Sequence, residues 1–257
     1  MLNHIKAFLF TLAFALGFLP ASYVNAGDAI IIDAEDGAGP WGNAKGEGAG
    51  NDLVKAAFKA AGMEVTLHIV SYATCKEEVM HGTVVACYAM STAPLLENFV
   101  KFADKPLYTP WAGIYATTNA KPVTTVEELL KGHTIGTVYG YEYPALISNL
   151  QQKGFDVTAA ANEDVLMRKL DDGKSDFAIF MLDDLKNIDF LLRDVHVTHP
   201  PILRMKVPAP GSYVGFSLKH PDGLKVKKIF DTGFNKIINS GEYKKIVDHW
   251  KAETAGY

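Results

Sequence analysis

A strand–helix–strand pattern near the start of the chain constrains the fold more than any other feature. The segments are a short apolar strand at Ala29–Ile32, an amphipathic helix at Gly50–Ala61 that Gly62 stops, and a second strand at Val65–Val70. A helix between two strands at this spacing forms a βαβ unit, in which the strands run parallel and the helix covers the sheet. The pattern therefore predicts an α/β fold.

The same pattern starts again in the second half of the chain. The expected segments are a short helix at Val126–Leu130, a strand at Thr134–Val138, a helix at Pro144–Lys153, a strand at Val157–Ala159, a helix at Val165–Asp171 and a buried strand at Phe177–Met181. A second set of βαβ units in a chain of 257 residues predicts two similar lobes rather than one large domain.

The last part of the chain returns to strand and helix after a turn-rich break at Pro208–Gly211. A strand is expected at Val214–Leu218, and a long helix follows it. The apolar stripe of that helix consists of Phe230, Phe234, Ile237 and Ile238, at a spacing close to one helical turn. Ser240-Gly241 ends the helix, and a last helix is expected at Tyr243–Lys251.

The first residues have the pattern of a secretory signal peptide. Lys6 precedes the apolar run Ala7–Leu19, and Val24-Asn25-Ala26 is a small-x-small cleavage site. The run is shorter than the roughly 20 residues that span a membrane, which favours a cleaved leader at 1–26 over an anchor. A buried N-terminal helix is the alternative. We expect a periplasmic protein that is cleaved after Ala26.

Charge and motifs exclude several classes of function. The formal net charge is −4, without a basic patch for nucleic acid or anionic lipid. The chain has no Gly-x-Ser-x-Gly, His-Glu-x-x-His or phosphate-binding glycine motif, so we expect no enzyme and no cofactor. The eight histidines are scattered, and no metal site is expected.

Both cysteines, Cys75 and Cys87, lie in the exported part of the chain, where thiols tend to oxidise. A disulfide would tie a predicted helix at Cys75–His81 to the strand that follows it. Two independent buried thiols are the alternative. A zinc site is disfavoured because no histidine stands at ligand spacing beside both cysteines.

The order of the predicted elements from Tyr72 to Tyr108 is informative about the family that the chain resembles. After the helix come Gly82, a buried strand at Thr83–Met90, a polar loop at Ser91-Thr92, and the segment Phe102-Ala103-Asp104-Lys105-Pro106. The chain also ends on Gly241-Glu242-Tyr243, Ile246 and Trp250. In this order the sequence resembles the extracellular solute-binding proteins of family 3, the periplasmic receptors of polar amino acid ABC importers.

The resemblance implies a type II periplasmic-binding-protein fold, in which each of two lobes is a mainly parallel sheet flanked by helices. Residues 27–115 plus 214–257 would form the first lobe and 119–210 the second. The two crossovers would act as hinges near 115–118 and 211–213. A ligand would bind between the lobes, at the carboxyl ends of the strands. We expect a monomer.

The resemblance also implies a set of ligand contacts. They are Glu35, Trp41, Tyr72, Ser91 and Thr92 in the first lobe, and Tyr141, Glu142 and Asp183 in the second. In the family such an acid binds a ligand amine, the aromatic residues cover its side chain, and the small hydroxyl residues bind its carboxylate. Other roles stay open: Trp41 as a lid over its own core, Ser91 as a helix cap, and Asp183 as a solvated cap.

One departure from the family bears on the ligand. The arginine that holds a ligand carboxylate is replaced by Leu96, and the matched positions carry acids rather than bases. Burying a carboxylate without a cation costs several kcal/mol, so a neutral or amine-bearing solute is expected. Lys45 or Lys105 could instead replace the arginine.

The resemblance leaves the partner open. An ABC permease is the first expectation, and a ligand-sensing subunit for a membrane receptor is the alternative. A third possibility is a dehydratase-like enzyme on the same fold, with Glu142 as the acid.

Overall fold

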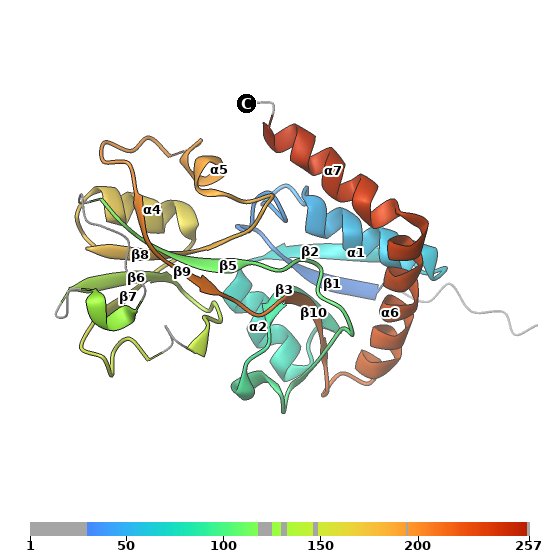
Figure 1. Ribbon diagram of the computed structural model, residues 1–257. Coiled ribbons are helices and arrows are strands. Elements are labelled where there is room, and N and C mark those ends of the chain that lie inside the picture. Colours follow the sequence, from blue (N-terminus) through green and yellow to red (C-terminus); the bar gives the residue numbers. More distant parts are fainter. Residues whose placement is uncertain (1–29, 118–124, 130–132, 146–148, 194, 256–257) are drawn as a thin grey trace, which may run out of the picture.

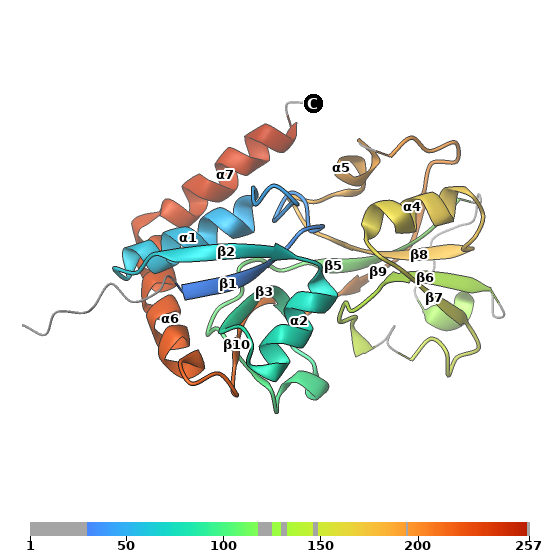
Figure 2. The ribbon, with the colours of Figure 1, turned by 180° about the vertical axis from the view of Figure 1, so that it is seen from behind.

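The computed structural model describes residues 30–117, 125–129, 133–145, 149–193 and 195–255. The expected leader and cleavage site lie outside these residues, as does part of the expected helix Pro144–Lys153. The described chain forms two sheets of five strands each, flanked by helices (Figures 1 and 2). The predicted two-lobed α/β fold is confirmed. None of the described helices is long and apolar enough to cross a membrane.

The sheet of the first lobe has the order β2-β1-β3-β10-β4. Its strands are β1 (Ile30–Glu35), β2 (Val65–Val70), β3 (Ala86–Ser91), β4 (Val100–Phe102) and β10 (Ser212–Ser217). Its helices are α1 (Ala49–Ala60), α2 (Tyr72–His81), the short η1 (Pro94–Leu96), α6 (Gly223–Ser240) and α7 (Glu242–Ala255). One face of the sheet packs on α1 and α6, and α2 packs on the other.

The sheet of the second lobe has the order β7-β6-β8-β5-β9. Its strands are β5 (Trp111–Ala116), β6 (Thr134–Val138), β7 (Asp156–Ala160), β8 (Phe177–Leu182) and β9 (Ile202–Pro208). Its described helices are η2 (Val126–Glu128), α4 (Glu163–Asp171) and α5 (Ile188–Leu192). The parallel core of three strands and the two antiparallel pairings repeat those of the first sheet.

In each sheet one strand among those described runs against the others, and that strand enters from the other lobe. In the first sheet it is β10, and in the second it is β5. Since β5 pairs with β8 and β9, the chain reaches the second sheet before Trp111, earlier than the hinge expected near 115–118. The return lies between Pro208 and Ser212. The division into lobes at the stated boundaries stays a prediction.

A disulfide fastens α2 to the sheet of the first lobe. Cys75 and Cys87 are bonded, with their Cα atoms 5.6 Å apart, so the expected bridge is present and neither thiol is free. Leu96, at the end of η1, is 1% exposed and packs in the same apolar cluster. Leu96, which the resemblance matches to a ligand-binding arginine, is therefore part of the core of this lobe.

Candidate ligand-binding site

A small cavity lies between the lobes, where strands of both sheets end. It is lined by Glu35, Ala38, Tyr72, Ala89, Ser91, Tyr108, Pro110, Tyr141, Glu142, Met181, Lys186 and Ser212. Its free volume is about 30 Å³, which is room for about two water molecules. A ligand larger than this volume requires side chains of the lining to move.

The structure brings together most of the residues expected at the site. Glu35, Tyr72, Ser91, Tyr141 and Glu142 line the cavity. Trp41 and Asp183 are buried beside it without lining it. Thr92 is exposed and does not line it, because β3 continues through Ser91 and the chain then turns outward.

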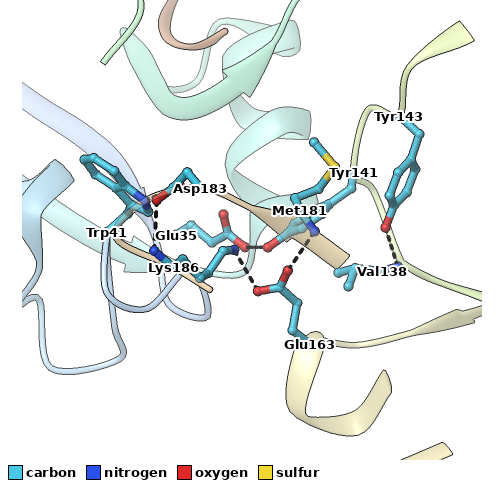
Figure 3. A network of polar contacts seen from close by, with 9 residues as sticks. All are labelled: Glu35, Trp41, Val138, Tyr141, Tyr143, Glu163, Met181, Asp183 and Lys186. Atoms are coloured by element: carbon cyan, nitrogen blue, oxygen red, sulfur yellow. Dashed lines mark hydrogen bonds and ion pairs between the residues drawn. The ribbon is translucent and has the colours of Figure 1, made fainter. Parts of the chain in front are cut away.

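Glu35 and Tyr141 connect the lobes at the floor of the cavity. Glu35 is the last residue of β1, and the Tyr141 hydroxyl donates a hydrogen bond of 2.6 Å to its Oε1 (Figure 3). Burial raises the pKa of Glu35 to about 7, although the Tyr141 hydrogen bond opposes the shift. A ligand amine at this carboxylate would restore its charged form, since a nearby cation favours the carboxylate.

Trp41 makes a second connection between the lobes. Its ring stacks on that of Tyr108, with centroids 3.8 Å apart. Its Nε1 donates a hydrogen bond of 2.7 Å to Asp183 Oδ2 (Figure 3). The other Asp183 oxygen accepts from the backbone N–H groups of Leu185 and Lys186, at 2.7 and 2.9 Å. Trp41 also packs in the core of its own lobe, which agrees with the lid alternative.

Glu142 enters the first lobe from the second and lies over the start of α2. Its carboxylate accepts from the Tyr72 hydroxyl, pairs with Lys76 Nζ at 2.9 Å, and accepts from the Ser91 backbone N–H at 3.4 Å. Ser71 caps α2 by accepting from Thr74 N, so the helix begins at Tyr72 rather than at Cys75 as expected. That earlier start places Tyr72 and Lys76 one helical turn apart, facing the cleft.

A buried ion pair beside the cavity was not anticipated from the sequence. Lys186 Nζ and Glu163 Oε2 lie 2.8 Å apart, and both side chains are almost fully buried (Figure 3). Lys186 follows the buried strand β8 closely, and this position is the signal that could have identified it. Lys45 and Lys105, the expected replacements for the arginine, are exposed and do not line the cavity.

The acids in and around the cavity outnumber the bases. The acids are Glu35, Glu142, Glu163 and Asp183, and the bases are Lys76 and Lys186. Lys76 is paired with Glu142, and Lys186 is paired with Glu163. Among the described residues that line the cavity, the basic side chain is Lys186, and it is already paired with Glu163.

Two five-stranded sheets of this topology, with a cavity between them at strand ends, define the two-lobed periplasmic-binding-protein fold. Searches against family models and against curated proteins found no match.

Solved structures match the fold over nearly the whole of their own length. A histidine kinase sensor domain with similarity to periplasmic binding proteins shares 16% identity over 86% of this chain and 95% of its own, with a TM-score of 0.74. An ancestral arginine-binding protein bound to arginine has 16% identity, coverages of 86% and 97%, and a TM-score of 0.73. The GluR0 ligand-binding core from Nostoc punctiforme, in complex with L-glutamate, has 16% identity, coverages of 86% and 98%, and a TM-score of 0.70.

Proposed function

We propose that this protein binds a small polar, amine-bearing solute between its two lobes. The observation that carries the proposal is the pair of acids at the cavity, Glu35 and Glu142, set among the tyrosines Tyr72, Tyr108 and Tyr141. Carboxylates bind an ammonium group strongly where water is excluded, and aromatic faces attract cations as well.

The position of Glu142 supports a ligand without a carboxylate. The Ser91 N–H and Lys76 form a place for an anion in the first lobe, and Glu142 already occupies it from the second lobe. A ligand carboxylate would have to displace Glu142 and leave a second buried acid to be paired. An amine that binds at Glu35 avoids this cost.

Lobe closure would accompany binding. The polar contacts across the cleft, Trp41 to Asp183, Tyr141 to Glu35 and Tyr72 to Glu142, all form between opposite lobes. Entry of a solute larger than the present free volume requires these contacts to open, and contacts from both lobes then favour the closed state again.

Paired ligands test this proposal. Isothermal titration with cadaverine against lysine, and with agmatine against arginine, compares each amine with the molecule that adds an α-carboxylate. We expect the amines to bind at least tenfold more tightly than their amino acids. Tighter binding of the amino acids would contradict the ligand class, and no binding across a broad panel of amines and amino acids would contradict solute binding.

Export and a membrane partner belong to the proposal as well. The leader pattern at 1–26 supports a periplasmic protein, and mass spectrometry of the exported protein should show Gly27 as its first residue. A full-length mass would contradict cleavage. An ABC permease is the proposed partner, and we propose no enzymatic activity.

A ligand-sensing subunit is the second candidate for the partner. It is favoured by the similarity to a histidine kinase sensor domain. Co-purification from membranes that carry the neighbouring gene products, with a permease or with a sensor kinase, distinguishes the two.

A further inference from the structure

A second cluster of polar side chains lies on the first lobe, apart from the residues that line the cleft cavity. Asp33 on β1 and His68 on β2 are register partners in the parallel sheet, so their side chains stand on one face (β1 and β2 are seen side by side in Figure 2). The helix α2 packs on that face and brings Glu78 to the pair. No metal motif is visible in the sequence here, because the three residues come from three separate elements.

The three side chains converge. His68 Nδ1 lies 3.0 Å from Asp33 Oδ1, and one ligand atom of each residue lies within 4.8 Å of the others. Asp33 is fully buried, yet its Oδ2 has no hydrogen-bond partner. A buried carboxylate oxygen without a partner is unfavourable, so a group that binds it would stabilise the fold.

The environment of Asp33 points to a cation. The unpartnered Oδ2 of Asp33 lies in a cluster that also holds the Glu78 carboxylate. Two adjacent carboxylates need either a shared proton or a positive ion between them. The cluster opens onto a cavity of about 630 Å³, which His220 and Asp222 also line, and an ion could enter there.

We propose that Asp33, His68 and Glu78 bind a divalent transition-metal ion of the Zn²⁺ class. One imidazole nitrogen and two carboxylate oxygens suit zinc, whereas Mg²⁺ and Ca²⁺ prefer oxygen ligands alone. The ion would satisfy the free oxygen of Asp33 and neutralise the carboxylate pair. Three protein ligands leave a coordination position for water or a further group from the cavity.

Zinc titration of the mature, disulfide-bonded protein tests the site. Equilibrium dialysis should find one Zn²⁺ per chain, with at least tenfold weaker binding in His68→Gln and in Asp33→Asn. The His68 side chain is 56% exposed, so His68→Gln should fold normally, which a thermal melt checks. The control is His133→Gln, which alters another His–Asp pair, at 3.2 Å, without a third ligand in the described residues.

The outcomes separate the alternatives. Retained zinc binding in His133→Gln and its loss in His68→Gln support the site. Equal weakening of zinc binding in His133→Gln and His68→Gln shows scattered surface binding and overturns the proposal. Undiminished zinc binding in both Asp33→Asn and His68→Gln overturns it as well. Absence of binding to the wild-type protein at 100 µM free Zn²⁺ overturns it as well, and leaves a shared proton between Asp33 and Glu78.

Discussion

The indole Nε1 of Trp41 and Oδ2 of Asp183 are joined by a buried hydrogen bond of 2.7 Å that links residues 142 positions apart. The bond connects the loop after β1 in one lobe to the loop after β8 in the other. Because the second Asp183 oxygen is held by its own loop, Trp41 is the partner that ties this aspartate to the opposite lobe.

Trp41→Phe should therefore favour the open form. Phenylalanine keeps an aromatic ring on Tyr108 but removes the donor, which leaves the Asp183 oxygen unpaired in the closed form at a cost of about 1–3 kcal/mol. Small-angle scattering should show a larger radius of gyration than for the wild-type protein. Trp250→Phe is the control, because its indole bonds to Asp52 within the first lobe. A larger radius in both variants would refute a specific role in closure.

Glu142→Ala should change the charge of the preferred ligand. The substitution frees Lys76 and the Ser91 N–H to bind a ligand carboxylate. We expect the affinity for lysine to rise about tenfold relative to cadaverine, in line with a charge-assisted hydrogen bond. Titration calorimetry measures both. Glu77→Ala, an exposed position on α2, should leave the ratio unchanged. An unchanged ratio in Glu142→Ala would show that the glutamate does not select against carboxylates.

Glu35 should make stability depend on pH. Burial raises the pKa of its carboxyl to about 7 in the folded protein, from 4.5 for the free side chain. The folded state therefore holds more protons between these values, and the free energy of unfolding falls as pH rises through this window, by about 3 kcal/mol.

Glu35→Gln should flatten that slope, because glutamine still accepts from Tyr141 but does not titrate. Urea denaturation at pH 4.5 and pH 8 measures it. Asp33, whose pKa is also raised to about 7, contributes a slope of the same sign. The difference between the wild-type protein and Glu35→Gln in how the free energy of unfolding changes with pH isolates the contribution of Glu35. The same pH dependence in both proteins would disprove a raised pKa of Glu35. The exposed Glu97→Gln is the control.

Leu96→Ala should destabilise the protein by about 2–5 kcal/mol, as truncation of a buried leucine does. The adjacent Leu95 is 71% exposed, and Leu95→Ala should change the free energy of unfolding by no more than about 0.5 kcal/mol. Chemical denaturation compares the two, and titration of each folded variant should give unchanged ligand affinity. Weaker binding in Leu96→Ala with little loss of stability would mean that this position contacts the ligand.

Removing the disulfide should cost about 3 kcal/mol, the loop-entropy value for a closed loop of this length. The double substitution Cys75→Ser and Cys87→Ser avoids an unpaired thiol, and urea denaturation against the oxidised wild-type protein measures the loss. Full stability of the double variant would contradict a stabilising role of the closed loop, even if reduction of the wild-type protein lowered its stability.

The elements of the parallel cores could be predicted from the sequence. β2 and β6 have the expected bounds, and α1 is displaced by one residue. In contrast, β5 and β9 were missed. Gly113 interrupts the apolar run of β5, and that strand is defined by its pairing with β8 and β9 rather than by a local pattern. In β9 the apolar Leu203, Met205 and Val207 alternate with Arg204 and Lys206, so this strand could have been predicted from the sequence.

The expected ligand contacts stay predictions, but the structure shows where their side chains lie. Glu35 and Tyr141 were expected from two separate loops, and the structure joins them. Lys76 and Lys186 were not expected at the site, although Lys76 lies one helical turn from Tyr72 and Lys186 follows β8 closely. Their pairing with Glu142 and Glu163 depends on tertiary contacts that the local sequence does not determine.

The strand that enters each sheet from the opposite lobe has a consequence for the order of folding. All five strands of the second sheet come from one continuous stretch, 111–208, so that sheet is complete as soon as this stretch is available. The first sheet is incomplete until β10 is available, because β10 lies between β3 and β4. The face of that sheet that packs on α1 is likewise not fully covered until α6 is available. During synthesis from the amino terminus, the second sheet could thus form before the first, although the first sheet contains the earliest strands of the chain.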